Sequence, residues 1–82
     1  MHAIAAQVSI YPLRTAHLGP PIERAQEVFR RAGLDVHEGP MSTVVTGDPH
    51  ALFSALEEAF AAVSGDGAAV LVVTVSNACP VG

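Results

Sequence analysis

Two stretches with apolar residues at helical spacing, set among four short β-type runs, constrain this 82-residue chain more than any other feature. Residues 3–11 alternate with period two, so that Ile4, Ala6, Val8 and Ile10 share one face. Apolar residues at helical spacing follow over 20–32 and again over 49–63. The remaining β-type runs cover residues 34–38, 42–46 and 68–76. The sequence therefore predicts the order β-α-β-β-α-β.

Turn and capping residues separate these segments. Pro20-Pro21 is a helix-start signal, and Gly33 has the position of a residue that ends a helix in the left-handed conformation. Asp48 followed by Pro49 predicts an N-cap and a first helical residue for the second helix. Because crossover connections are right-handed, this order predicts an α+β ferredoxin-like sandwich. We expect one domain over 1–82, with a four-stranded antiparallel sheet, two helices on one face, and the first and third strands central.

Apolar residues predict which surfaces are buried. The expected stripe of the first helix comprises Ile22, Ala25, Phe29 and Ala32. That of the second comprises Leu52, Phe53, Leu56, Ala59, Phe60 and Val63. The last strand is apolar on both faces, although helices can cover only one of them. Half of the residues are apolar in a very small domain, so we expect a homodimer or homotetramer that buries the open sheet faces.

Charge and composition exclude several classes of function. The formal charge is −4, with four arginines and no lysine, which argues against nucleic acid as a partner. The N-terminus lacks a signal-peptide pattern and no apolar run is long enough to span a membrane, so we expect a cytoplasmic protein without membrane insertion. The single cysteine, Cys79, excludes an internal disulfide. The four histidines lie in four separate segments, so neither a metal site nor a cofactor is expected.

Polar, uncharged side chains mark a candidate binding site. Gln7, Ser9 and Tyr11 share the face of the first strand that points away from the helices. Strand direction places Ser42 and Thr43 beside the Tyr11 end of that strand. Such groups can hydrogen-bond the edge of a neutral heterocycle, but they can equally build a polar subunit interface.

Asn77 and Cys79 are expected at the opposite end of the sheet, because the last strand runs antiparallel to the first. They could complete a second pocket edge or a site across an interface, or simply end the strand in a turn. Cys79 has no basic partner in the pattern, which makes it a poor nucleophile. No glycine-rich phosphate loop is present, so an acylphosphatase-like enzyme on this fold is also poorly supported.

Three blocks of sequence resemble the YkoF-like family of thiamine-binding proteins. They are residues 6–13 (AQVSIYPL), residues 39–48 (GPMSTVVTGD) and residues 76–80 (SNACP). The resemblance covers nearly the whole chain. It implies a ferredoxin-like fold and non-catalytic binding of thiamine or its hydroxymethylpyrimidine half. It corresponds to the short, single-domain form, which would associate as a homodimer or larger assembly.

An aminopyrimidine presents ring-nitrogen acceptors and an amino donor, and its flat face can stack on an aromatic or thioether group. The positions that we expect to contact it are Gln7, Ser9, Tyr11, Met41, Ser42, Thr43 and Asn77. We therefore expect a non-enzymatic protein of thiamine salvage or transport. The alternative is an oligomeric regulatory or interaction module of the same fold that binds no thiamine.

Overall fold

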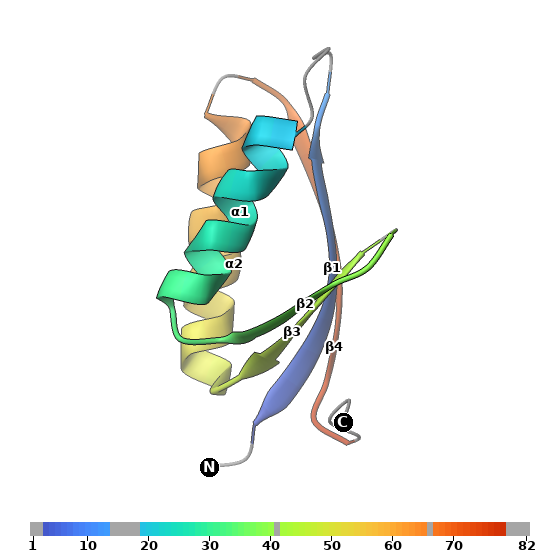
Figure 1. Ribbon diagram of the computed structural model, residues 1–82, viewed down its shortest axis with the longest axis vertical. Helices are drawn as coiled ribbons and strands as arrows, with labels where there is room; N and C mark the ends of the chain where they lie inside the picture. Colours follow the sequence, from blue (N-terminus) through green and yellow to red (C-terminus); the bar gives the residue numbers. More distant parts are fainter. Residues whose placement is uncertain (1–2, 14–18, 41, 66, 79–82) are drawn as a thin grey trace.

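The computed structural model describes residues 3–13, 19–40, 42–65 and 67–78. Its elements follow the predicted order (Figure 1). They are β1 (Ile4–Pro12), α1 (Gly19–Arg31), β2 (Asp35–Glu38), β3 (Thr43–Gly47), α2 (Pro49–Ser64) and β4 (Ala69–Ser76). At the majority of strand ends, the predicted bound and the observed bound differ by one residue.

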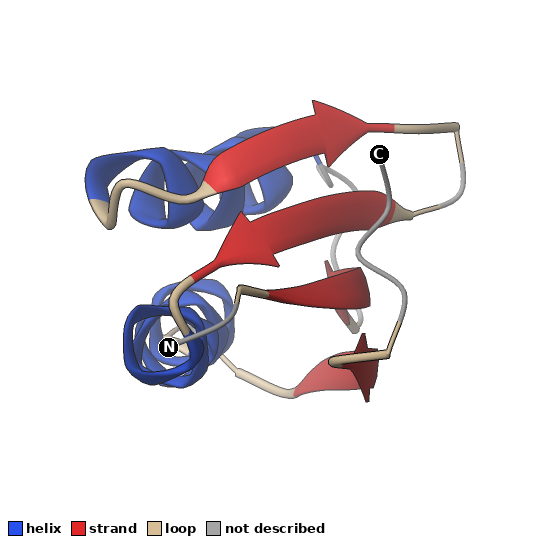
Figure 2. Ribbon diagram, turned by 90° about the horizontal axis from the view of Figure 1, so that it is seen from below, coloured by secondary structure: helices blue, strands red, loops and turns tan. Residues whose placement is uncertain are grey.

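The four strands form one antiparallel sheet in the order β2-β3-β1-β4, with both helices on the same face (Figure 2). The predicted α+β ferredoxin-like sandwich, with the first and third strands central, is confirmed. The helices divide the sheet between them, because α1 contacts β1 and β2 whereas α2 contacts β1, β3 and β4. Among the described residues, no helix is both long enough and apolar enough to cross a membrane.

Asp48 and Gly33 take the positions predicted for them, at the start of α2 and after the end of α1. The side chain of Asp48 accepts a hydrogen bond from the backbone N–H of Ala51 at 3.0 Å, which caps α2. Gly33 follows α1 with φ of +81°, a conformation that only glycine adopts without strain. Its N–H bonds to the carbonyl of Arg30 at 3.0 Å. These local signals fix where each helix meets the sheet.

The core lies between the sheet and the helices. Its most buried large side chains are Phe29 of α1, Leu52 of α2 and Val45 of β3. The remaining core members are Ile4, Ala6, Val8, Ala25, Val28, Leu34, Ala55, Leu56, Ala59 and Val63. The inward face of β1 predicted from its alternation is therefore buried along most of its length.

The prediction for α2 was too broad. Phe53 and Phe60 are 54% and 38% exposed, and Ala55 takes a place on the buried side instead. Five inward residues already cover the part of the sheet that α2 contacts, so the two phenylalanines fall on the flank of the helix. Ala32 was also expected inward, but it lies exposed in the turn after α1.

The open face of the sheet differs in character from strand to strand. Register places Gln7 beside Val44 on one side and beside Thr74 on the other. Val72 of β4 is 56% exposed on this face. Among the described residues of this face, charge is found on the edge strand β2, where Asp35 and His37 pair at 3.1 Å. The centre of the open face is therefore neutral.

Candidate functional site

A cavity occupies the end of β1 that β3 does not reach. The β1–β3 pairing runs from Ile4–Gly47 to Val8–Thr43, whereas the β1–β4 pairing continues to Pro12–Ala69. Residues 9–12 of β1 therefore have a neighbouring strand on one side only. The missing strand leaves a gap between β1, α1 and the β2–β3 turn.

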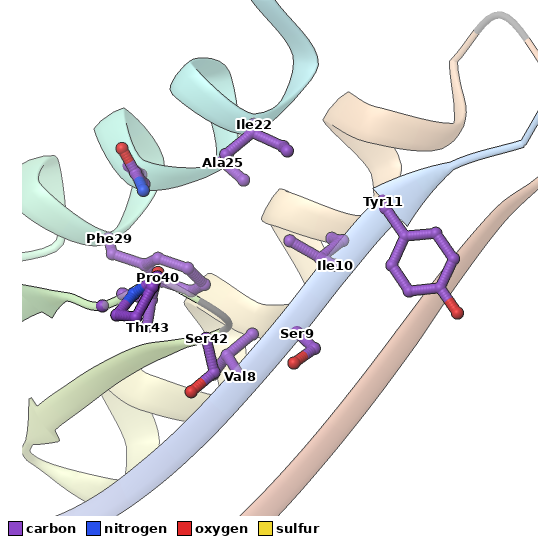
Figure 3. Close-up of a pocket in the computed structure, with 12 residues that line it drawn as sticks. Val8, Ser9, Ile10, Tyr11, Ile22, Ala25, Phe29, Pro40, Ser42 and Thr43 are labelled. Carbon is purple, nitrogen blue, oxygen red and sulfur yellow. The ribbon is translucent and has the colours of Figure 1, made fainter. Parts of the chain in front are cut away.

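The gap is a cavity of about 210 Å³. Three segments supply its walls (Figure 3). The lining residues are Val8, Ser9, Ile10 and Tyr11 of β1, Ile22, Ala25, Gln26 and Phe29 of α1, and Gly39, Pro40, Ser42 and Thr43 of the turn and β3. None of these side chains is charged at neutral pH. The described lining therefore offers no charged side chain to a ligand.

The cavity lies partly on the helix side of the sheet, whereas the β1 positions predicted for the site lie on the open face. Thr43 pairs with Val8 and shares its helix-facing side, whereas Ser42 is one residue away and lies on the opposite side. Figure 3 shows Ile10 directed toward α1 and the Tyr11 ring directed away from it. Because β3 ends before this point, the cavity extends around the free side of β1.

A hydrogen bond links the predicted polar residues of β1 to those of the 42–43 segment. The side-chain amide of Gln7 donates to the hydroxyl of Ser42 at 3.1 Å. Gln7 does not line the cavity, but it holds a residue that does. The prediction that the first strand and the 42–43 segment lie together is confirmed, and Gln7 takes a supporting position in it.

The turn that forms the cavity's lip is tightly closed. The N–H of Gly39 donates to the carbonyl of Ser42 at 2.9 Å. A Cβ atom at Gly39 would lie 3.0 Å from that same carbonyl oxygen, so a side chain here would push the turn open. Beside the turn, half-exposed Arg30 of α1 forms an ion pair with half-exposed Glu38 of β2. These contacts connect the lip to both layers of the sandwich.

Four of the predicted site residues lie at the cavity. Ser9, Tyr11, Ser42 and Thr43 line the cavity. Asn77 follows β4 next to Ser76, which pairs with Ala5 at the opposite end of β1. Within one chain, Asn77 is thus remote from the cavity. Met41 and Cys79 lie outside the described residues.

The helical wall of the cavity was missed by sequence reasoning. Ile22, Ala25 and Phe29 were assigned to the core alone, and Gln26 was not considered. Gln26 is partly buried and lines the cavity. One signal was present: it is the single uncharged polar side chain in a helix whose other polar side chains are all charged. Among the described residues, no cluster of His, Cys, Asp and Glu could hold a metal ion.

Comparison with known proteins finds similar sequences and similar folds. Residues 6–76 match the family model described as "Thiamine-binding protein". The chain is 36% identical over 67 residues to the UPF0045 protein MJ1052 of Methanocaldococcus jannaschii, covering 80% of this chain and 67% of the relative. A crystal structure of MJ1052 superposes with a TM-score of 0.85 at 32% identity, over 93% of this chain and 80% of the other.

A putative thiamine biosynthesis/salvage protein from Thermotoga maritima, TM0486, shares the fold with a TM-score of 0.78. Its sequence is 20% identical, and the match covers 90% of this chain and 82% of that one. The family match includes β1, α1 and the β2–β3 turn, which together form the cavity. The resemblance to YkoF-like proteins seen in three sequence blocks is confirmed: this chain belongs to the thiamine-binding protein family.

Proposed function

We propose that this protein binds thiamine or its hydroxymethylpyrimidine half without transforming it, in salvage or transport of the vitamin. The observation that carries the proposal is the uncharged cavity at the end of β1. Membership of the thiamine-binding family supports the ligand class. The Thermotoga maritima neighbour, described as a putative thiamine biosynthesis/salvage protein, supports the pathway.

The size of the cavity favours a single heterocyclic ring. At about 210 Å³ it is smaller than the roughly 300–1,000 Å³ that drug-sized ligands occupy. The pyrimidine half of thiamine suits this space, with the thiazolium left at the mouth. Phe29 and Pro40 supply apolar surface for the ring, and the Gln26 amide with the Thr43 hydroxyl supplies donors and acceptors for its edge.

The lining residues favour binding over catalysis. General acid–base chemistry usually relies on His, carboxylate, Lys, Cys or Tyr side chains. Among the described residues, Tyr11 alone of these types lines the cavity, and its side chain is directed away from α1. The remaining polar side chains are hydroxyls and an amide. Turnover of thiamine by the purified protein would contradict this part of the proposal.

A pair of threonines on one strand tests the site. Thr43→Val should weaken hydroxymethylpyrimidine binding by about three- to tenfold, because it removes one hydrogen bond. Thr46→Val is the matched control, since Thr46 is equally intermediate in burial but occupies the open face. Calorimetry with thiamine and with hydroxymethylpyrimidine measures both. Equal affinities for the two variants would exclude this cavity as the binding site.

Replacing Ser42 and Thr43 together by Ala should abolish binding and leave the mass of the assembly unchanged. We also propose that the open sheet faces associate in a homodimer or homotetramer, because the exposed Val72 and its neutral surroundings suit a covered face. If the double Ala variant changes the mass in sedimentation but not the affinity, the alternative of an oligomeric module without a thiamine ligand is favoured.

A further inference from the structure

The hydroxyl of Ser42 lies at the border between the open face of the sheet and the cavity. Ser42 directly precedes β3, where the pairing with β1 has ended at Val8–Thr43, and it lines the cavity (Figure 3). Its carbonyl accepts the Gly39 N–H at 2.9 Å, so the backbone here is held by the turn. The hydroxyl can still rotate, and it carries one proton and two lone pairs. The direction of that proton decides whether Ser42 donates to a ligand or accepts from it.

Gln7 contacts this hydroxyl as a donor. Its side-chain N–H donates to the Ser42 oxygen at 3.1 Å. The contact occupies one lone pair of the oxygen, and the Ser42 proton cannot point back at a donor. That proton is therefore directed away from Gln7, where an acceptor on a ligand in the cavity can receive it.

The backbone of Gln7 is fixed by two neighbouring strands. Gln7 lies in the middle of β1, beside Val44 of β3 and Thr74 of β4. Neither neighbour carries an ionisable group that would compete for the Gln7 amide. The central strand of the sheet thus supplies a fixed donor for a hydroxyl at the edge of the cavity, which is how a supporting residue orients one that binds.

We propose that Gln7 is a positioning residue that holds the Ser42 hydroxyl as a donor, so that the site selects heterocycles with an unprotonated ring nitrogen. This inference rests on the proposed function of the cavity. The aminopyrimidine half of thiamine presents such a nitrogen next to its amino group. The corresponding pyrimidinone has a carbonyl in place of the amino group and a proton on that nitrogen. It would set one donor against another, so the site distinguishes two rings of nearly equal size.

Three side chains at position 7 test the direction of the hydrogen bond. Calorimetry gives, for each protein, the ratio of the affinities for hydroxymethylpyrimidine and for its pyrimidinone analogue, and wild type should prefer the former. Gln7→Glu offers an acceptor alone, so the Ser42 proton turns to the carboxylate and the lone pairs face the ligand. The ratio should then fall by about three- to tenfold. Gln7→Met offers neither group, and its ratio should lie between the other two.

The matched control is Thr74→Glu. It places the same charge directly beside position 7 in an exposed location, but on the side of β1 away from Ser42. The control should keep the wild-type ratio, whereas an equal fall in Thr74→Glu would show that charge alone is responsible and would overturn the proposal. Circular dichroism establishes that each variant is folded.

The outcomes separate this inference from the proposed function. If wild type binds neither ring, both are wrong. If wild type binds hydroxymethylpyrimidine and Gln7→Glu leaves the ratio unchanged, even with weaker binding of both rings, the positioning role is overturned and the binding function stands. A ratio that rises in Gln7→Glu would also overturn it, because the Gln7 carbonyl would then be the group that faces Ser42.

Discussion

The two halves of β1 differ in what lies beside them. From Ile4 to Val8 the strand has β3 on one side and β4 on the other, and its inward side chains are buried. From residue 9 onward it has β4 alone, and the place of the missing strand is the cavity. The cavity therefore forms where β3 ends earlier than β1.

Shortening a side chain that packs near the doubly paired half of β1 should cost far more stability than shortening one at the cavity. Leu52→Ala should cost about 3 kcal/mol of unfolding free energy, because Leu52 is fully buried and leaves a void. Ile22→Ala, at the cavity, should cost about 1 kcal/mol, since Ile22 is already partly exposed. Urea unfolding gives both values. Comparable losses would mean that the two halves are packed alike.

Enlarging an alanine should also cost more stability away from the cavity than beside it. Ala59→Leu overpacks a site with no exposed surface and should cost about 1–3 kcal/mol. Ala25→Leu extends from a buried residue that lines the cavity, so its added atoms have space to enter. We expect that variant to change stability by less than about 0.5 kcal/mol and to lose ligand binding. If it binds normally, the ligand does not occupy the space beside α1.

The smallest effect is expected at the lip. Arg30→Gln removes the ion pair with Glu38 that joins α1 to β2. Because both side chains are half exposed, the loss should be about 0–1 kcal/mol and should shrink in high salt. Thermal unfolding at two ionic strengths measures it. A larger loss that persists in high salt would indicate that the pair organises the whole cavity.

Sequence patterns were sufficient for the fold because each element carries its own local signal. Asp48 with Pro49 starts α2, Gly33 ends α1, and the alternation of β1 identifies its inward face. Residues in β1 and the 42–43 segment were also correctly placed together. Strand direction alone determines that proximity in an antiparallel sheet.

Sequence patterns did not predict those features that depend on how neighbouring elements pair and pack. The length difference between β3 and β1 is set by register, so nothing local indicated that the cavity would reach the helix side. Similarly, the periodicity of α2 includes Phe53 and Phe60, but only the width of the sheet shows that they remain exposed.

A two-dimensional NMR titration of the backbone amides with hydroxymethylpyrimidine tests the central claim most directly. The account predicts that shifts concentrate at residues 9–11 of β1, at Gln26 and at the Gly39 turn, while Ala5 and Asn77 at the other end stay unchanged. Shifts centred on Asn77 or spread over the open face, with the cavity residues unaffected, would contradict it.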